Sequence, residues 1–275
     1  MIGDNLAHAA AATLERVRSE APLVHCITNN VVPNFTANAL LAAGAAPAMV
    51  DIVGESGMFA EIASALLVNL GTPTPEQRGA ILEAVEGASR AGTPWVLDPV
   101  AIGALPIRTH LAQQLAKRRP TVIRGNPSEL LALAGSGTGG RGVDATDSPD
   151  AAAAAVDALA LRTEAVIAAS GEVDLITDGT TRIRVHGGSV LLTKVTGGGC
   201  ALGSIIGAFV AARGEASVLA ATAAAHAFYS VAAERAASES GGPGSFSVRF
   251  LDALASVTGE DVAAAGLLST EPASA

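Results

Sequence analysis

The sequence contains little of several residue types, and each shortage excludes a class of protein. Aromatic residues make up only 3% of the 275 residues, whereas hydrophobic residues, many of them alanine, make up 49%. This composition predicts a core of closely packed helices and aliphatic strands. It excludes an intrinsically disordered chain, which would combine low hydrophobicity with high charge. A chain of this length can form one large domain with a substantial core.

Cysteine is scarce, with Cys26 and Cys200 as the two examples. They form neither a disulfide framework nor a metal-ligand pattern, and the histidines have no zinc-like spacing. We expect Cys26 to pack within a strand, and His226 to lie in the core or at an interface. The low cysteine content suits a reducing compartment, and the first residues lack the features of a secretory signal. These observations predict a cytoplasmic protein.

Positive charge and long apolar runs are also missing. The net charge is −9, and the main basic cluster is Lys117-Arg118-Arg119. Nucleic acid is therefore not an expected partner, because phosphate binding needs a positive face. The apolar stretch 201–212 is too short to cross a bilayer, so no membrane partner is expected either. An anionic ligand would have to be held by backbone N–H groups, single cations or a metal ion.

Short apolar segments alternate with helical patterns along the chain. The expected strands are 23–27, 46–50, 66–70, 94–97, 121–124 and 166–169, and the expected helices include 5–19, 31–43, 75–90, 128–134 and 149–162. This alternation predicts an α/β fold with a mostly parallel central sheet and helices on both faces. Without a Pro- or Ser-rich linker, we expect a single domain over residues 1–275, with a disordered tail after about residue 262.

Three later β segments change this pattern. They cover 173–177, 181–186 and 190–195, and they are separated by Asp178-Gly179 and Gly187-Gly188. Both dipeptides are hairpin signals. The sequence therefore predicts antiparallel strands at one edge of the sheet.

A glycine turn follows the last of these segments. Gly197, Gly198 and Gly199 separate the expected buried strand 190–195 from an expected buried helix at 201–212. Glycine allows several N–H groups to converge, and a helix start attracts an anion. Cys200 lies near the first helical turn, where we expect the pKa of a thiol to fall. The same pattern would also fit a tight connection with one small buried cysteine.

Polar residues follow several of the expected strands. They are Asn29, Asp51, Asp98, Arg124 with Asn126 and Glu129, and Ser170. The carboxyl ends of parallel strands meet at one edge of a sheet, where α/β proteins bind ligands. Asp98 could simply cap a turn, and the spacing of Asn126 and Glu129 fits a capping box. The functional alternative is that Asp98 and Glu129 organise a hydrated Mg²⁺ on nucleotide phosphates.

The segment 135–140 matches G-x-G-x-x-G, the dinucleotide-binding fingerprint. It follows a predicted helix instead of a strand, and no helix begins directly after it. We therefore interpret it as a flexible loop. A P-loop motif is absent from the sequence, which excludes a P-loop kinase.

Five motifs in order resemble those of the hydroxyethylthiazole kinase family, thiamine-salvage enzymes of the ribokinase-like superfamily. They are His25-Cys26-Ile27-Thr28-Asn29-Asn30-Val31-Val32, Leu97-Asp98-Pro99-Val100, Arg124-Gly125-Asn126-Pro127-Ser128-Glu129, Thr196-Gly197-Gly198-Gly199-Cys200 and Gly242-Pro243-Gly244-Ser245-Phe246. The resemblance covers about residues 15–255. The first motif and the glycine turn ending in cysteine are its specific parts, whereas the Asp-Pro and Asn-x-x-Glu motifs occur more widely in the superfamily.

The resemblance implies a ribokinase-like fold and a reaction. The reaction is the ATP- and Mg²⁺-dependent phosphorylation of the hydroxyl of 4-methyl-5-(2-hydroxyethyl)thiazole. The resemblance further implies a homotrimer with active sites at the subunit interfaces. The turn in this chain is T-G-G-G-C where the family usually has T-G-T-G-C, so Gly198 lacks a side-chain hydroxyl.

The resemblance also assigns roles to individual residues. The thiazole would contact Met49 and Gly197, together with Asn29. ATP would contact Arg124 and Ser170, together with Asn126. Asp98 and Glu129 would lie in the Mg²⁺–phosphate region. Cys200 occupies the position of the aspartate base of sugar kinases. The backbone N–H groups of Gly197, Gly198 and Gly199 would stabilise charge on the transferred phosphoryl group.

Three other functions remain open from the sequence. A kinase of the same fold could act on another small alcohol, such as a hydroxymethylpyrimidine or pyridoxal; the cysteine at the base position and the motif beginning at His25 speak against it. A second alternative is the repair dehydratase for hydrated nicotinamide nucleotides. A third is a nucleotide-binding regulatory protein without catalysis, which the presence of Asp98, Glu129 and Cys200 disfavours.

Overall fold

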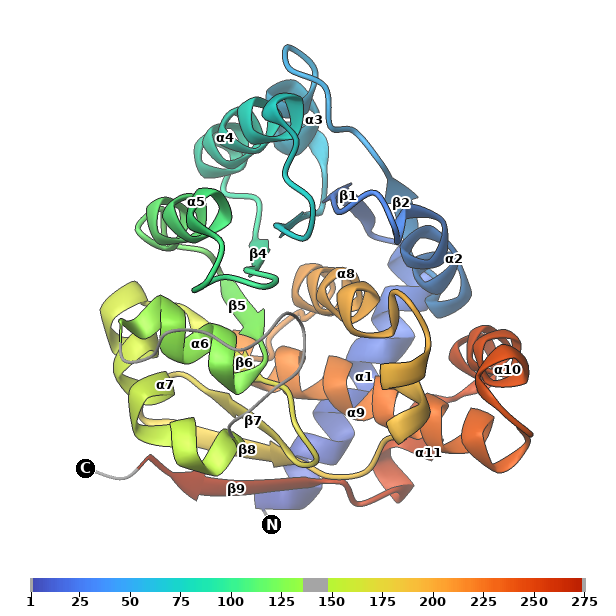
Figure 1. Cartoon of the computed structure of the whole chain (residues 1–275). Helices are drawn as coiled ribbons and strands as arrows, with labels where there is room; N and C mark the ends of the chain where they lie inside the picture. The colour runs from blue at the N-terminus through green and yellow to red at the C-terminus, as the bar shows by residue number, and fades with distance from the viewer. Residues whose placement is uncertain (1, 136–147, 274–275) are drawn as a thin grey trace.

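The computed structural model describes residues 2–135 and 148–273 (Figure 1). Its strands are β1 (Leu23–Ile27), β2 (Ala46–Ala48), β3 (Ala65–Asn69), β4 (Trp95–Asp98), β5 (Val122–Gly125), β6 (Val166–Ala169), β7 (Asp174–Thr177), β8 (Thr181–Val185) and β9 (Leu268–Pro272). They form one sheet in the order β2-β1-β3-β4-β5-β6-β7-β8-β9. Neighbours from β2 to β6 are parallel, and β6 to β9 are antiparallel. The predicted α/β fold with an antiparallel edge is confirmed.

Helices cover both faces of this sheet. They are α1 (Ile2–Glu20), α2 (Pro33–Ala43), α3 (Ser56–Ile62), α4 (Pro75–Ala91), α5 (Pro106–Ala116), α6 (Pro127–Ala134), α7 (Pro149–Thr163), α8 (Gly198–Ala211), α9 (Val218–Ser238), α10 (Pro243–Ser256) and α11 (Gly259–Ala264). Figure 1 shows α4 to α7 on one side and α1, α8 and α9 on the other. Within the described part of the chain, no helix is both long and apolar enough to span a membrane.

The pleat of the strands separates the core into two layers. Leu67 packs into the layer that contains α1, α2, α8, α9 and α10, whereas its neighbours Leu66 and Val68 pack into the layer that contains α4 to α7. All residues of β3 are buried. This is why the central strands consist of nearly continuous aliphatic residues: a parallel strand covered on both faces has no solvent-facing side.

Local signals begin and end the helices where the sequence predicts. Thr74 and Gln77 form a capping box at the start of α4. Gly44 ends α2 in the left-handed region with φ +97°, and Gly135 ends α6 in the same way with φ +83°. The rest of the predicted loop 135–140 lies outside the described residues. The Asp178-Gly179 hairpin is confirmed, since β7 and β8 pair in antiparallel fashion across it.

Two predictions for the last third of the chain are corrected. Residues 190–195 are not a strand, and Gly187-Gly188 is not a hairpin turn: the segment Val190–Lys194 is a 3₁₀-helix, η1, capped by Ser189. The physical reason lies at the other end of the chain. Residues Leu268–Pro272, in the region expected to be disordered, form β9 and occupy the edge of β8 that another strand would need.

An aromatic cluster supports the segment that follows η1. Phe250 of α10 stacks on Phe246, lies edge-on to Tyr229 of α9 at a ring-centroid distance of 4.8 Å, and faces Phe35 of α2 at 6.5 Å. The hydroxyl of Tyr229 donates a 2.7 Å hydrogen bond to the carbonyl oxygen of Gly198. The cluster therefore connects three helices to the glycine turn.

We predict that Phe250→Ala lowers the free energy of unfolding by about 3–5 kcal/mol, because it removes a fully buried ring and leaves a cavity. Urea unfolding followed by circular dichroism measures the change. Val248→Ala is the matched control, since Val248 is 63% exposed on the same helix; we expect a change within about 0.5 kcal/mol. Similar small losses for both variants would contradict the role of the cluster.

Candidate active site

The polar residues at the carboxyl ends of the strands lie along one edge of the sheet. Asn29 follows β1, Asn69 and Asp98 end β3 and β4, Arg124 lies in β5, and Ser170 follows β6. These strands are neighbours in the sheet, in the order β1-β3-β4-β5-β6. Residues separated by more than a hundred positions in sequence are thereby placed side by side, as expected for a parallel sheet.

A continuous series of hydrogen bonds joins these side chains. Asn29 Nδ2 donates to Cys200 Sγ at 3.4 Å and to Asn69 Oδ1 at 3.0 Å. Asn69 Nδ2 donates to Asp98 Oδ2 at 2.8 Å. Arg124 continues the series: its Nη1 approaches Asp98 Oδ2 at 3.4 Å, and its Nη2 donates to the Ser170 hydroxyl at 3.1 Å.

Asp98 is fully buried, and its hydrogen bonds are incomplete. Oδ2 has two donors, but Oδ1 has no hydrogen-bond partner among the described residues. Desolvation raises the pKa of Asp98, and the nearby Arg124 guanidinium and the Asn69 amide partly offset the shift. Arg124 Nε is likewise without a partner within the described residues. Within the described residues, this ion pair therefore contains one buried acceptor and one buried donor that have no partner.

Glu129 has a different environment at the start of α6. Its carboxylate accepts hydrogen bonds from the backbone N–H groups of Ala101 (2.7 Å) and Asn126 (2.9 Å), and Asn126 Oδ1 accepts from the N–H of Glu129. The predicted capping box is therefore present. Desolvation, with a further contribution from Asp98, raises the pKa of Glu129 to about 7.

The glycine turn lies beside Arg124. Gly197 has φ +94°, and a Cβ there would lie 3.0 Å from Phe35 Cδ1. A Cβ on Gly198 would lie 2.6 Å from the carbonyl oxygen of Leu192, so a side chain at this position would require the backbone at Leu192 to shift. At Gly199 the Cβ position is 3.5 Å from Arg124 Nη2. The start of α8, with the positive end of its dipole, thus borders the guanidinium group.

The pKa of Cys200 is raised, which corrects the expectation of a lowered one. Burial is the main cause and the negative charge of Asp98 adds to it, while Arg124 and the Asn29 and Asn69 amides act in the opposite direction. The helix start is present as predicted, but the thiol is largely removed from water. Desolvation disfavours the thiolate more strongly than the nearby cation favours it.

The donor set fits a magnesium ion that is held mainly by a nucleotide. Within residues 2–135 and 148–273, no group of three or more His, Cys, Asp and Glu side chains could hold a metal alone. Mg²⁺ usually keeps several waters and takes one or two carboxylates together with substrate phosphates. The unpartnered Oδ1 of Asp98 suits that mode of binding.

Comparison with known proteins identifies the family. Residues 14–260 match the model of the hydroxyethylthiazole kinase family. The chain is 56% identical over 260 residues to a hydroxyethylthiazole kinase of Clavibacter sepedonicus, covering 94% of each chain, and 53% identical over 260 residues to one of Kineococcus radiotolerans, covering 94% of this chain and 92% of the relative. The chain belongs to the hydroxyethylthiazole kinase family.

Solved structures agree with this assignment. The hydroxyethylthiazole kinase of Pyrococcus horikoshii superposes with a TM-score of 0.86 at 35% identity, over 96% of this chain and 99% of that one. The pyridoxal kinase of Bacillus subtilis, solved as an ADP complex, gives a TM-score of 0.56 at 19% identity, over 78% of this chain and 91% of that one. The second comparison supports the fold alone. The predicted ribokinase-like architecture is confirmed.

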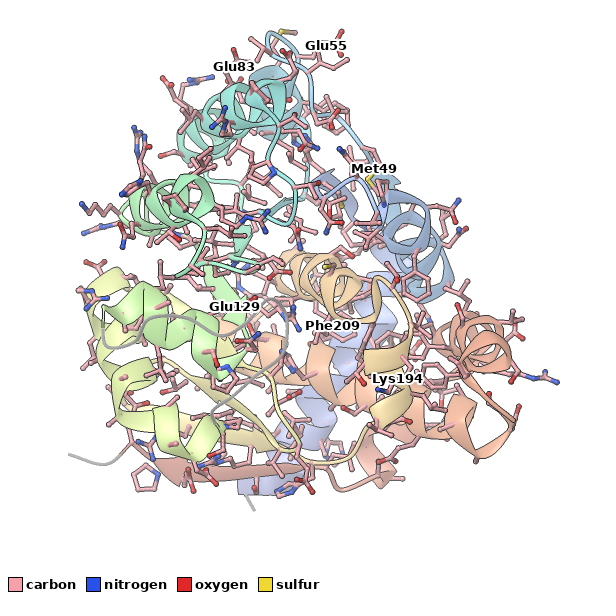
Figure 2. All side chains as sticks on the ribbon, viewed as in Figure 1. Met49, Glu55, Glu83, Glu129, Lys194 and Phe209 are labelled. Atoms are coloured by element: carbon pink, nitrogen blue, oxygen red, sulfur yellow. The ribbon has the colours of Figure 1, made fainter. Side chains whose placement is uncertain are left out.

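In this hydroxyethylthiazole kinase family member, the predicted site residue Met49 follows the outermost strand β2 and is not part of the hydrogen-bonded series of the described residues. Met49 follows β2 at the same edge of the sheet and is 37% exposed. Its neighbour Val50 is held by His25, whose Nε2 lies 2.6 Å from the carbonyl oxygen of Val50. Figure 2 shows Met49 beside α2, and Glu129 belongs to α6, so the predicted residues are spread along this edge of the sheet.

Asn69 is a site residue that sequence analysis missed. It falls inside the predicted strand 66–70, whose mostly aliphatic residues indicate a buried strand. The overlooked signal is an amide in a strand whose other residues are aliphatic. A buried polar side chain at a strand end needs partners, and here it has them on both sides.

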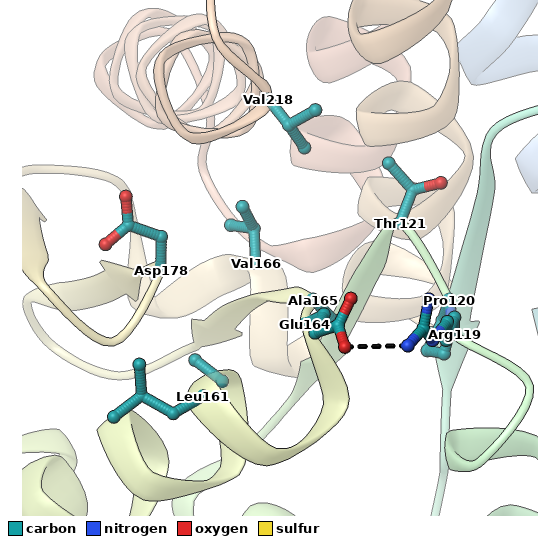
Figure 3. A pocket seen from close by; sticks show the side chains of 10 residues that line it. Arg119, Pro120, Thr121, Leu161, Glu164, Ala165, Val166, Asp178 and Val218 are labelled. Carbon is teal, nitrogen blue, oxygen red and sulfur yellow. Dashed lines mark hydrogen bonds and ion pairs between the residues drawn. The ribbon is translucent and has the colours of Figure 1, made fainter.

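Two surface hollows lie away from this series. One of about 500 Å³ lies at the opposite ends of β5 and β6, and Arg119 and Glu164 form a 2.8 Å ion pair at its edge (Figure 3). The other, of about 550 Å³, is lined by Val50, Glu55, Met58, Phe59 and Ile62. Neither contains the unpartnered atoms of Asp98 and Arg124, so the chemistry is assigned to the series instead.

The raised pKa of Cys200 predicts slow alkylation near neutral pH. Only the thiolate reacts with iodoacetamide, so we expect a rate at pH 7 below that of N-acetylcysteine and still rising at pH 9. Mass spectrometry of the Cys26→Ala variant reports on Cys200 alone; Cys26 itself is buried, which raises its pKa to about 12. A plateau below pH 7 would contradict the assignment.

Proposed function

We propose that this chain transfers the γ-phosphoryl group of ATP to the hydroxyl of 4-methyl-5-(2-hydroxyethyl)thiazole, with Mg²⁺, as a step of thiamine salvage. The observation that carries this proposal is the series of buried side chains from Cys200 to Arg124. It places a cysteine and an amide at one end and a charged pair at the other. These two ends suit an alcohol and a polyphosphate respectively.

The alcohol is proposed to bind at the Cys200 end. The thiazole would contact Met49 and Gly197, and Asn29 would hold the thiol beside the hydroxyl. With its raised pKa, Cys200 is a neutral thiol at pH 7 and is a poor acceptor for the alcohol proton. We therefore assign it to positioning the hydroxyl. A loose phosphoryl-transfer transition state requires little help from a base.

ATP is proposed to bind at the other end of the series. Arg124 offers its unpartnered Nε to a phosphate, and Ser170 orients the guanidinium through its hydroxyl. Asn126 lies at the start of α6 in the same region. The N–H of Gly198, expected to face the ligand, instead donates to the carbonyl oxygen of Val195 at 3.1 Å. The N–H groups of Gly199 and Cys200 would therefore stabilise the charge on the transferred group, an effect of roughly 2.7–4 kcal/mol for one donor in subtilisin.

Asp98 and Glu129 are the residues that would hold the metal, Asp98 through Oδ1 and Glu129 from the start of α6. Bound Mg²⁺ would supply positive charge that offsets the charge of the phosphates. Asn69 and Arg124 keep the Asp98 carboxylate in place by occupying its other oxygen.

We propose also that the chain forms a homotrimer with active sites at the subunit interfaces, and that it is cytoplasmic. Exposed apolar side chains support an interface: Ile52, Val53, Met58 and Ile62 are between 46% and 72% exposed on α3 and the segment before it, next to Met49. Such a patch is typical of a subunit contact. Both cysteines are free thiols, which suits a reducing compartment.

Analytical ultracentrifugation tests the trimer. We expect a species of about three chain masses, and we expect Met58→Glu to shift it toward the monomer because a charge would be buried in the contact. Val248→Glu, a similar change at an exposed valine on α10, is the control. A wild-type monomer at micromolar concentration would contradict the proposal.

A product assay tests the reaction. Purified protein is incubated with ATP, Mg²⁺ and hydroxyethylthiazole, and ADP and thiazole phosphate are followed by mass spectrometry. We expect equal amounts of the two products and no reaction when EDTA removes the metal ion. Phosphorylation of hydroxymethylpyrimidine or pyridoxal without any thiazole phosphate would contradict the proposed substrate.

Two variants in this assay test the roles of the glycine turn and of the Cys200 thiol. Gly197→Val should abolish turnover, because a branched side chain does not fit at φ +94° against Phe35. Cys200→Ala should retain measurable, weaker turnover if the thiol only positions the hydroxyl. Equal activities for the two variants would contradict this ranking.

A further inference from the structure

Asn69 is an amide whose orientation is fixed by its surroundings. Its Oδ1 accepts two hydrogen bonds, from the backbone N–H of Gly71 and from Asn29 Nδ2, both at 3.0 Å. A flipped amide would place N–H groups against two donors. Its Nδ2 must therefore point the other way, toward Asp98 Oδ2.

The turn after β3 is shaped to make this possible. A Cβ on Gly71 would lie 2.6 Å from Asn29 Cβ, so the glycine lets the Asn29 side chain pack directly against the turn. Asn69 is 3% exposed and Asn29 is also 3% exposed, so water does not compete for these bonds. The two amides therefore form one buried, hydrogen-bonded unit.

The two ends of this unit contact the two halves of the proposed site. On one side Asn29 donates to Cys200, where the alcohol is proposed to bind. On the other side Asn69 occupies Oδ2 of Asp98, which leaves Oδ1 as the unpartnered oxygen. A change at Asn69 would therefore disturb both halves at once.

We propose that Asn69 is a positioning residue that couples the alcohol half of the site to the nucleotide half, by holding Asn29 against Cys200 and turning Oδ1 of Asp98 toward the metal–phosphate region. This inference rests on the proposed function for the identity of the two halves. The hydrogen bonds that carry it do not depend on the substrate.

The test replaces the amide by an apolar group of similar size, Asn69→Leu, and measures both halves separately. Calorimetry gives the affinity for ADP with and without Mg²⁺, and mass spectrometry gives the rate of Cys200 alkylation at pH 8. Asn38→Leu, at an amide on α2 that bonds only to Asn34 within the described chain, is the matched control. Asn69→Ser is made alongside, so that a poorly folding leucine variant does not end the test.

We expect Asn69→Leu to lower the Mg²⁺-dependent gain in ADP affinity at least tenfold and to slow Cys200 alkylation at least threefold. The alkylation slows because the amide donors that stabilise the thiolate are lost. Affinity for ADP without Mg²⁺ should stay within twofold. Asn29→Ala should slow alkylation and change the ADP affinities less than Asn69→Leu does, because the N–H of Gly71 still holds the Asn69 amide toward Asp98.

Three results would overturn the coupling. They are a lower melting temperature with both measurements unchanged, a change in only one half, and faster alkylation, which would indicate a loosened site. The wild-type product assay keeps the two proposals apart. If the variants show coupling but the wild-type protein does not phosphorylate the thiazole, the role of Asn69 stands and the proposed substrate is wrong. If the protein forms thiazole phosphate but the variants show no coupling, the role of Asn69 is wrong and the proposed function stands.

Discussion

A buried carboxylate next to a buried guanidinium is the constraint on which this site depends. Asp98 has no exposed surface, and Arg124 is almost as well covered. Removing two charges from water is costly unless hydrogen bonds compensate. Here the hydrogen bonding is incomplete, since Oδ1 of Asp98 and Nε of Arg124 lack partners in the described chain. In the proposed complex, the cation would coordinate Asp98 Oδ1 and a phosphate oxygen would accept from Arg124 Nε, so ligand binding would offset part of the cost of burying this pair.

The sheet and the aromatic cluster supply the rigidity that this pair needs. Five adjacent parallel strands fix the spacing between Asn29 and Ser170, and the helices on both faces keep those strands in place. The glycine turn is positioned from the opposite direction, by Tyr229 on the carbonyl of Gly198 and by Phe35 against Gly197. In the proposed site, the substrate groups would therefore bind between the strand ends and the glycine turn, which contact different residues of the core.

Much of this arrangement could be predicted from the sequence, and the failures have identifiable causes. Aliphatic strands, the Asp178-Gly179 hairpin and the residues that end the parallel strands follow from local patterns. The prediction of a strand at 190–195 is wrong although its apolar, β-branched pattern fits a strand. The available sheet edge is occupied by β9 from the far end of the chain. No local signal reveals that competition. The role of Asn69 is missed because the aliphatic residues around it indicate only a buried strand, and one amide does not change that pattern.

The prediction for Cys200 fails for a different physical reason, and its correction changes the mechanism. A cysteine at a helix start beside an arginine has the sequence context of a reactive thiolate. Sequence does not report how deeply the thiol is buried or that Asp98 lies nearby, and these two effects raise its pKa. The same low-polarity surroundings that suppress the thiolate would strengthen the proposed interaction of Arg124 with a phosphate. A site arranged in this way favours positioning and charge neutralisation over proton abstraction. Phosphoryl transfer depends on the first two effects and needs little help from a base.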